Sequence, residues 1–230
     1  MQGTLYGVGV GPGDARLMTY LAVETIEKCP VIAVPGREKE AVVSYQIAGG
    51  IIKGLDKKEC LCLTTPMTKD KAVLDAAYRN SAEEIMEQLR QGKDVAYLTL
   101  GDPTVYSTYI YIHRLVKQQG FQGEIINGVP SFLAVSARLS DSLADRAEQI
   151  HIIPASYDVE EALKLPGTKV LMKAASKMPE VKKQLCNQGL SVQMVENCGM
   201  ADERIYHTVK EMPDEAGYYS LVIVKDREPH

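Results

Sequence analysis

The sequence predicts an α/β fold, and two observations support this. Short runs rich in valine and isoleucine alternate with longer runs whose apolar residues recur at helical spacing, through most of the 230 residues. Several short runs are apolar at every position, which is typical of strands covered by helices on both faces of a sheet. Two runs end in corners rich in glycine, LYGVGVGPGD at Leu5–Asp14 and LTLGDPTVYSTY at Leu98–Tyr109. Such corners indicate a ligand site where strands end.

The segments expected to be strands are short and rich in β-branched residues. In chain order they are Thr4–Val8, Val31–Val34, Glu59–Leu63, Val95–Leu100, Glu124–Ile126, Ile150–Ile153, Lys169–Met172, Ser191–Val195 and Tyr218–Val224. Helices are expected where apolar residues repeat every three or four positions, at Arg16–Cys29, Lys69–Gln91, Val105–Gln119, Ser131–Leu139 and Ala175–Asn187. Asp14 is placed to cap the first of these helices, and Gly92 to end the second.

A domain boundary is expected near Gly120–Gly123, where strand and helix patterns divide into two groups. We therefore predict an N-terminal α/β domain over residues 1–120 and a C-terminal α/β domain over residues 121–230, with mixed sheets. The first contains both glycine corners. A cleft between two such lobes is a natural place for a ligand.

Composition narrows the class of protein. The hydrophobic content of 45% and charged content of 24% are typical of a globular protein, and no apolar run has the length of a membrane span. The N-terminal MQGTLYGVGV has no basic region ahead of its apolar residues, so we expect a cytoplasmic protein without a secretory signal or membrane partner. The net charge of −4 does not favour a nucleic-acid binder, which would more often be basic.

The cysteines do not predict a disulfide framework, because five is an odd number and the chain is not short. Cys60 and Cys62 would point to one face of a strand, as half of a metal site would. No nearby histidine or cysteine completes such a site. We expect buried free thiols and no metal site.

The opening corner does not match a nucleotide-binding motif. Gly7, Gly9, Gly11 and Gly13 are spaced by two throughout, so the G-x-G-x-x-G fingerprint is not met, and no phosphate-loop lysine follows. Pro12 lacks an N–H group that could bind phosphate. The loop is suited to close backbone approach to a ligand, and a tight strand-to-helix turn is the alternative.

Two further corners offer similar chemistry. Gly101 lets the backbone turn or approach a ligand without a side chain, and Pro103 fixes one dihedral. Asp102 is either the cap of the next helix or an acceptor that faces a ligand. A third corner, INGVPSFLAVSARL, begins at Ile126 and opens a helix of small residues. Three strand-to-helix corners fit a ligand at the carboxyl ends of strands in an open α/β sheet.

These corners and two later segments together resemble the tetrapyrrole methylase family. The segments are GVGVGPGD, LTLGDPTVYST, GVPSFLAVSARL, VLMKAAS and ENCGMADERIY, and they occur in the family's order from residue 5 to about residue 225. Each segment alone is weak, whereas the combination is specific. Within the family, GDPTVYSTYIY, IAVPG, TTPMTKDK and MKAAS look most like the methyltransferases that act on carbon 20 of precorrin-2 or cobalt-factor II in cobalamin biosynthesis.

The resemblance implies two α/β domains with S-adenosylmethionine, the methyl donor, in the cleft between them, and it implies a homodimer. It places the following residues at or near the cofactor: Pro12, Gly101, Asp102, Pro103, Val105, Tyr106, Ser131, Phe132, Met172, Gly199, Met200, Leu221 and Val222. The family often has threonine where this chain has Pro130, so Ser131 is expected to replace that hydroxyl.

The implied substrate is a tetrapyrrole with several carboxylates, which arginine and lysine would bind. The candidates are Arg16, Arg37, Lys69, Lys71 and Lys173, and solvated surface charge is the alternative for each. Any cobalt is expected to arrive inside the substrate, because His113, His151 and His207 are isolated in the sequence.

Methyl transfer from a sulfonium to an electron-rich carbon needs little acid–base machinery, because the donor is already activated. The sequence identifies no base: Tyr106, Tyr109 and Glu196 are candidates with structural roles as the alternative. Two other functions remain open, a sister methylase that acts on another ring carbon and a non-catalytic module that binds tetrapyrrole or S-adenosylmethionine.

Overall fold

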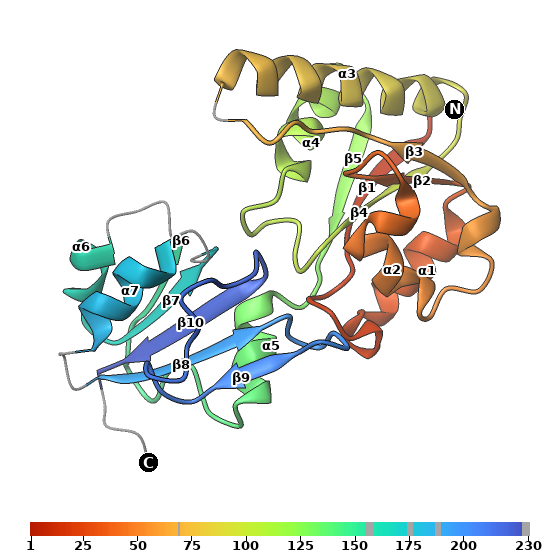
Figure 1. Ribbon diagram of the computed structural model, residues 1–230. Helices are drawn as coiled ribbons and strands as arrows, with labels where there is room; N and C mark the ends of the chain where they lie inside the picture. Colours follow the sequence, from red (N-terminus) through yellow and green to blue (C-terminus); the bar gives the residue numbers. More distant parts are fainter. Residues whose placement is uncertain (69, 155–158, 174–176, 187–189, 227–230) are drawn as a thin grey trace. The chain divides into compact units, whose positions relative to one another are not determined.

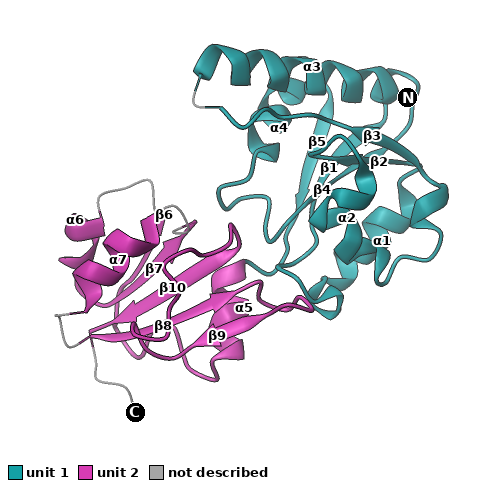
Figure 2. Cartoon of the chain, in the orientation of Figure 1, with its two compact units in different colours: residues 1–130 teal, residues 131–230 magenta. Residues whose placement is uncertain are grey.

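The chain folds into two compact units, residues 1–130 and 131–230 (Figure 2). The computed structural model describes residues 1–68, 70–154, 159–173, 177–186 and 190–226 (Figure 1). The division lies later in the chain than the boundary expected near residue 120, because the strand Gln122–Ile126 pairs with the first strand of the first unit. Strands and helices alternate through the first unit and through the second as far as the strand Ser191–Glu196, so the α/β class is confirmed.

A parallel sheet forms the centre of the first unit. It contains β1 (Thr4–Gly9), β2 (Val31–Val34), β3 (Glu59–Cys62), β4 (Val95–Thr99) and β5 (Gln122–Ile126), in the order β3-β2-β4-β1-β5. These pairings are all parallel, so mixed pairing belongs to the other sheet. Parallel strands need crossover connections, which return the chain to the same starting edge. The carboxyl ends of all five strands therefore lie along one edge.

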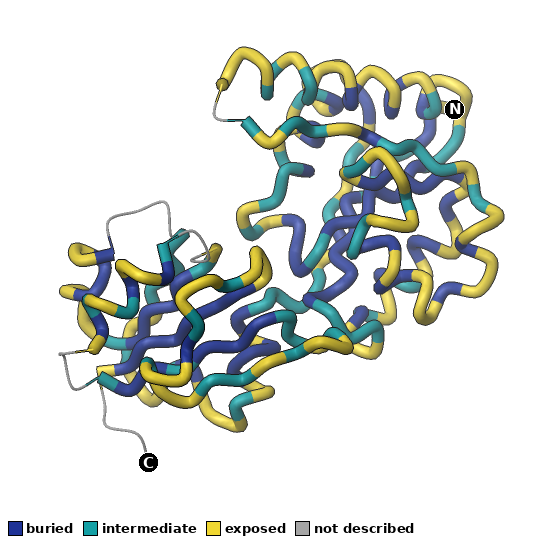
Figure 3. The backbone as a smooth tube through the Cα atoms, in the orientation of Figure 1, coloured by how far each residue is buried: buried dark blue, intermediate teal, exposed yellow. Residues whose placement is uncertain are grey.

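Helices cover both faces of this sheet (Figure 1). α1 (Tyr20–Lys28) and α2 (Val43–Gly49) pack on one face, and α3 (Lys71–Arg90) and α4 (Tyr109–Gln118) pack on the other. Alternate residues of each strand supply the two cores, because successive strand side chains point to opposite faces. Every residue of β4 is consequently buried, and Figure 3 shows the same burial through the interior of the unit.

Two helices begin later than the sequence predicts. Asp14 caps only a 3₁₀ helix, Ala15–Leu17, and Thr19 caps α1 by accepting from the N–H of Ala22 at 3.1 Å. α4 begins at Tyr109 and not near Val105, because the preceding residues form a loop. α3 follows its prediction closely: Asp70 caps it. At its far end, the backbone turns through Gly92 with φ of 78°.

The second unit has a mixed sheet. It contains β6 (Ile150–Pro154), β7 (Thr168–Met172), β8 (Ser191–Glu196), β9 (Arg204–Tyr206) and β10 (Ser220–Lys225), in the order β6-β7-β10-β8-β9. β6 and β7 are parallel, and the other pairs are antiparallel. α6 (Val159–Leu163) and α7 (Met178–Leu185) share a buried core with the sheet, and α5 (Ser131–Arg138) contacts β10.

Short elements are the ones that the sequence missed. They are α2, α6, β9 and the 3₁₀ helices Lys39–Ala41 and Leu55–Lys57, each too short for a clear periodic pattern. The ends of the expected helix Ala175–Asn187 and residues 174–176 of the MKAAS segment lie outside the described residues. Among the described residues, the structure contains no helix that is both long and apolar enough to cross a membrane.

Candidate functional site

The candidate site begins at the carboxyl edge of the first sheet. The loop Val10–Asp14 follows β1, residues 35–38 follow β2, residues 100–108 follow β4, and Asn127 follows β5. Open parallel sheets bind ligands outside this edge. The three corners predicted from sequence therefore occupy one edge of one sheet.

Backbone contacts hold the corners together. Gly11 and Gly101 form an antiparallel bridge, in which the N–H of Gly101 donates to Gly11 at 2.8 Å and the reverse bond is 3.3 Å. A Cβ atom added at Gly9 would lie 2.6 Å from the carbonyl oxygen of Gly101 and 2.6 Å from the nitrogen of Gly128. Real Cβ atoms do not approach that closely. Glycine at positions 9 and 128 is thus required for packing of the corners against one another.

Asp102 is buried at this junction, and its carboxylate accepts four hydrogen bonds. Oδ1 accepts from the N–H of Thr104 at 2.7 Å and from the Thr104 hydroxyl. Oδ2 accepts from Nδ2 of Asn127 at 3.1 Å and from the N–H of Gly128 at 3.0 Å. Burial opposes ionisation, but these hydrogen bonds outweigh it, so the pKa of Asp102 lies below its usual value. The carboxylate is an internal acceptor rather than the cap of α4.

The loop after Asp102 presents Tyr106 outward. Tyr106 has φ of 48°, a conformation that non-glycine residues rarely adopt, and the residue is 51% exposed. The hydroxyl groups of Thr99 and Ser107 form a hydrogen bond of 2.8 Å across the base of the loop. Strained backbone persists where surrounding contacts fix it, and such strain gathers at ligand sites. The loop therefore exposes an aromatic side chain, on a backbone of restricted conformation, next to the buried Gly101–Pro103 corner.

Tyr109 has a structural position behind the corner. Its ring fills the space beside Gly7, where an added Cβ atom would lie 2.0 Å from the ring. Its hydroxyl is 2.8 Å from Nδ1 of His113 and donates to the carbonyl of Glu124 at 3.2 Å. Burial raises the pKa of Tyr109, and burial lowers the pKa of His113. These contacts assign Tyr109, one of the three candidate bases, to the core.

Glu196 is also buried and hydrogen-bonded. It accepts from the N–H of Gly217 and from the hydroxyl of Tyr206 at 3.4 Å. These contacts stabilise the end of β8 beside the start of β10, where Glu196 pairs with Ser220. Glu196 therefore has a structural role in the second unit.

The predicted residues of the second unit gather at one edge of its sheet. Met172 ends β7 and is the register partner of Leu221 near the start of β10, while Gly199 and Met200 follow the end of β8. The φ of Gly199 is 76°, and its N–H donates at 2.8 Å to Glu203, which forms an ion pair with Arg138. Met172 and Met200 are half-buried. This edge offers apolar, polarisable side chains beside a fixed glycine turn.

Three other residues that the resemblance places near the cofactor are buried, and a fourth is half-buried. Val222 is fully buried within the core of the second unit, and Phe132 is buried in α5. Pro12 is buried in the opening loop. Ser131 is the first residue of α5 and is half-buried. The structure thus gives Val222 a packing role.

The four described residues among those predicted to bind the substrate's carboxylates are on the protein surface. Arg16 is exposed and pairs with Asp14 at 2.6 Å, and this hydrogen-bonded pair lowers the pKa of the Asp14 carboxyl. Arg37 follows β2, Lys71 is the first residue of α3, and both are exposed. Lys173 has φ of 58°, and its ammonium lies 5.8 Å from the ring centroid of Tyr218. Lys69 lies outside the described residues.

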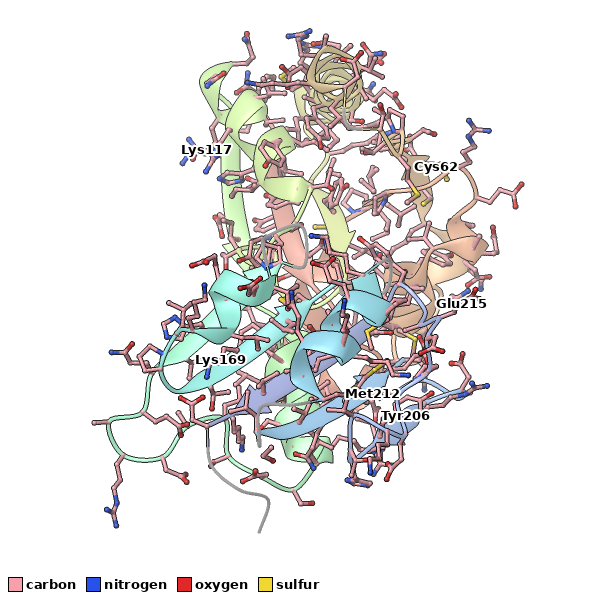
Figure 4. The ribbon with its side chains drawn as sticks, turned by 60° about the vertical axis from the view of Figure 1, so that its left-hand side comes forward. Cys62, Lys117, Lys169, Tyr206, Met212 and Glu215 are labelled. Atoms are coloured by element: carbon pink, nitrogen blue, oxygen red, sulfur yellow. The ribbon has the colours of Figure 1, made fainter. Side chains whose placement is uncertain are left out.

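The two neighbouring cysteines are partly buried on the edge strand β3, where Figure 4 labels Cys62. Burial and the adjacent Cys62 raise the pKa of Cys60 to about 12. Among the described residues, no group of three or more histidine, cysteine, aspartate or glutamate side chains could hold a metal ion.

Sequence reasoning missed Asn127, Thr104 and Tyr218 as members of these clusters. Asn127 and Thr104 are the partners of Asp102, and Tyr218 is the partner of Lys173. The dipeptide Asn127-Gly128 signals a turn, but a turn signal does not reveal which distant side chain it meets.

Comparison with known proteins decides the family. The sequence profile of the tetrapyrrole (corrin/porphyrin) methylases matches residues 4–213. The chain is a tetrapyrrole methylase. The family consists of S-adenosylmethionine-dependent methyltransferases, so the chain belongs to an enzyme class with that methyl donor.

This tetrapyrrole methylase has relatives with named activities. It is 36% identical over 170 residues to a probable cobalt-precorrin-2 C(20)-methyltransferase of Methanocaldococcus jannaschii, covering 74% of this chain and 71% of that protein. It is 29% identical over 240 residues to a precorrin-2 C(20)-methyltransferase of Sinorhizobium sp, covering 98% and 97%. It is 26% identical over 232 residues to a cobalt-precorrin-2 C(20)-methyltransferase of Salmonella typhimurium, covering 97% of each.

The methylase also shares its fold with solved structures. A cobalt precorrin-4 methyltransferase superposes with a TM-score of 0.75 at 20% identity, covering 96% of this chain and 94% of the other. A uroporphyrin-III C-methyltransferase from Thermus thermophilus, solved with S-adenosylhomocysteine, superposes with a TM-score of 0.72 at 20% identity, covering 97% and 98%.

Proposed function

We propose that this tetrapyrrole methylase transfers a methyl group from S-adenosylmethionine to C-20 of precorrin-2 or cobalt-factor II, in cobalamin biosynthesis. The observation that carries the proposal is the agreement among relatives. Proteins from an archaeon and from two bacterial genera are named for this position, and two of them match nearly the whole chain. Any cobalt would belong to the substrate.

The residues at the two sheet edges fit the chemistry of the cofactor. The backbone at Gly101 and Asp102 allows close approach, and each carbonyl oxygen keeps a second lone pair, which suits the ribose and the amino-acid end. Met172, Met200 and Leu221 offer an apolar, polarisable edge, which suits adenine. The remaining members of the proposed site are Pro12, Pro103, Val105, Tyr106, Ser131, Phe132, Gly199 and Val222.

The chain's own contribution to the reaction is positioning. S-adenosylmethionine supplies an activated methyl group when bound. The corner at Gly101–Pro103 fixes the backbone along which the donor is proposed to lie, and the strained loop holds Tyr106 beside it. Orienting two reactants and excluding water can lower a barrier by about 7–11 kcal/mol. No acid–base residue is required for the transfer step itself.

Carboxylate groups of the substrate are proposed to bind Arg16, Arg37, Lys69, Lys71 and Lys173. Arg37 is the sharpest candidate, because it is exposed directly after β2 at the carboxyl edge of the sheet. Replacing Arg37 with glutamine should raise the KM for the tetrapyrrole several-fold and leave the KM for S-adenosylmethionine unchanged. Arg79→Gln on α3 is a matched surface control, because it removes the same charge away from the corners.

A turnover assay tests the reaction. The protein and S-adenosylmethionine labelled with ¹³C in the methyl group are incubated without oxygen, separately with metal-free precorrin-2 and with cobalt-factor II. Mass spectrometry should show the gain of one methyl group on at least one substrate, and ¹³C NMR should place it on C-20. The faster substrate decides whether cobalt is present at this step.

One observation keeps a sister reaction as the second candidate. The chain is 27% identical over 197 residues to a precorrin-4 C(11)-methyltransferase of Mycobacterium tuberculosis. If S-adenosylhomocysteine binds but neither C-20 substrate gains a methyl group, the C-20 proposal fails and precorrin-4, precorrin-3 and uroporphyrinogen III are assayed next. Tight binding of ligands without any turnover would indicate a non-catalytic module.

We also propose that the protein is a homodimer, as the family resemblance implies. Sedimentation velocity should give a mass near twice the 25.3 kDa of one chain. A single species of 25.3 kDa at micromolar concentration would contradict the dimer. A cytoplasmic location stays a prediction.

A further inference from the structure

The Asp102 carboxylate is saturated by partners within the protein. A carboxylate has about four lone-pair positions for donors. The N–H and hydroxyl of Thr104, Nδ2 of Asn127 and the N–H of Gly128 supply four donors. The Asp102 carboxylate in the proposed cofactor corner therefore has all four acceptor positions occupied by groups of the protein. Its contribution to ligand binding must arise through the groups it holds.

The hydrogen bonds of Asp102 join two loops whose preceding strands are not neighbours in the sheet. Asp102 follows β4 and Asn127 follows β5, and β1 lies between these strands in the sheet. The loop after β1 is held by the bridge between Gly11 and Gly101. The side-chain hydrogen bonds of Asp102 therefore cross the end of β1 and join the corner after β4 to the corner after β5.

The Asn127 corner is also fixed from its other side. The hydroxyl of Thr19, which caps α1, donates to the carbonyl of Asn127 at 3.2 Å. Gly128 has no space for a side chain, because an added Cβ would lie 2.2 Å from the carbonyl of Gly101. A displacement of the Asn127–Gly128 segment would consequently move the carbonyl and backbone of Gly101.

We infer that Asp102 is a positioning residue for the cofactor site, with Asn127 as its partner, and that its carboxylate clamps the corner after β5 onto the Gly101 corner. The clamp fixes the backbone that the proposed function assigns to S-adenosylmethionine, and the inference rests on that assignment. The Asp102 side chain itself does not contact the cofactor.

Asp102→Asn tests the clamp with almost no change in volume. An amide replaces one acceptor oxygen with an NH₂ group, and in either orientation this donor faces a backbone N–H that cannot accept, that of Thr104 or that of Gly128. At least one of the four hydrogen bonds is lost, and the corner must shift to relieve the contact between the two N–H donors. A shift of about 1 Å at a binding site can cost up to about 100-fold. We expect the dissociation constant for S-adenosylhomocysteine to rise by about tenfold or more.

Asp94→Asn is the matched control. Asp94 directly precedes β4 and accepts from the N–H of Thr4 at 2.8 Å, so it joins β4 to β1 at their amino ends. It is the same residue type in the same sheet, at the edge away from the corners. This variant keeps a side-chain oxygen that accepts from Thr4, so it should change the urea midpoint of unfolding only slightly and the dissociation constant for S-adenosylhomocysteine by less than about twofold. Isothermal titration calorimetry measures the binding of each variant.

An exchange of partners tests the pairing itself. Asn127→Asp alone places a second carboxylate against Asp102 and should weaken binding. In the double variant Asp102→Asn with Asn127→Asp, the new amide can donate to the new carboxylate. The double variant should bind S-adenosylhomocysteine several-fold more tightly than Asn127→Asp, because the amide relieves the pair of carboxylates, a non-additive result that interacting residues give. Asn127→Ala, which removes one of the four donors from an exposed residue, is expected to fold and to weaken binding modestly.

A ligand-free measurement separates this inference from the proposed reaction. The amide of Gly128 should exchange its hydrogen faster in Asp102→Asn than in the native chain, whereas the amide of Thr4 should exchange at the native rate in both variants, because Asp94→Asn keeps the oxygen that accepts from it. Loss of methylation with intact binding of S-adenosylhomocysteine would defeat the C-20 proposal and leave the clamp in place. Three results would overturn the clamp. The first is equal weakening of S-adenosylhomocysteine binding by Asp94→Asn and Asp102→Asn. The others are unchanged binding in Asp102→Asn and absence of binding to the native chain.

Discussion

At the scale of single residues, Gly7 of β1 must be glycine because a buried aromatic ring lies against it. An added Cβ atom would lie 2.0 Å from the ring of Tyr109, which is fully buried and cannot retreat. Forcing extra atoms into a packed core typically costs about 1–3 kcal/mol. Gly7→Ala should lower the free energy of unfolding by about that amount or more in urea titration.

Gly49 provides the opposite case. It ends α2, and an added Cβ would meet no atom within 4 Å. Alanine has the higher helix propensity and restricts the unfolded chain, so Gly49→Ala should stabilise the protein by about 0.5–1 kcal/mol. Urea titration beside Gly7→Ala measures both changes. A loss of stability in both variants would contradict the argument that local space decides the sign.

His113 predicts a dependence of stability on pH. Burial favours the neutral imidazole, Lys117 and Arg114 act in the same direction, and the pKa of His113 is therefore lowered. The unfolded chain binds the proton more readily, with a pKa of about 6.5. The free energy of unfolding should consequently fall as the pH decreases from about 6.5 toward the folded-state pKa.

The measurement is urea unfolding of the native chain and of His113→Gln at pH 7.5 and pH 5.5. Glutamine keeps a polar group near the hydroxyl of Tyr109 but does not titrate. The native chain should lose more stability between the two pH values than the variant does. Identical losses would show that His113 is not the group responsible.

At the scale of elements, the start of α3 is set by local chemistry. Asp70 accepts from the N–H groups of Ala72 and Val73 at 2.9 and 3.3 Å. Asp70→Ala should cost about 1 kcal/mol of stability, because it leaves these N–H groups without their cap. Asp70→Asn keeps the acceptor oxygen and should cost much less in thermal unfolding. Equal costs would indicate that the charge, and not the hydrogen bond, matters.

The same scale explains which boundaries the sequence could predict. Gly92 ends α3 through a positive φ that glycine favours, and this is a local signal. α4 begins later than predicted because Thr104 is bound to Asp102 and Ser107 is bound to Thr99. Those side-chain contacts hold residues 101–108 as a loop although their composition is compatible with a helix. Competition of this kind is invisible to hydrophobic periodicity.

At the scale of the whole molecule, each unit has a sheet and a core of its own. Residues 1–130 contain a complete five-stranded sheet with helices on both faces. We expect a fragment of residues 1–130 to fold alone, since independent cores are the property of domains. Circular dichroism during urea titration should show one cooperative transition. A fragment without such a transition would show that the first core requires residues after 130.

In the second unit, a buried lysine on β7 forms an ion pair with the residue that follows β10. Lys169 on β7, labelled in Figure 4, is fully buried and forms an ion pair with Asp226 beyond β10. Asp226 also accepts from the N–H of Gly167 at 2.6 Å. Hydrophobic periodicity predicts an apolar residue at a buried strand position. The burial of Lys169 could therefore not be predicted from the sequence. Its partner lies 57 positions away in the chain.

The sequence by itself determined the α/β class, most strands, the ordered motifs of the family and the three glycine corners, because these are local patterns of hydrophobicity and backbone freedom. Only the tertiary structure decided what the corners meet. Gly9 and Gly128 leave room for each other and for Gly101, and Asp102 binds a glycine 26 positions later. These contacts depend on the order of strands in the sheet, which places β1 between β4 and β5, and no local pattern encodes that order.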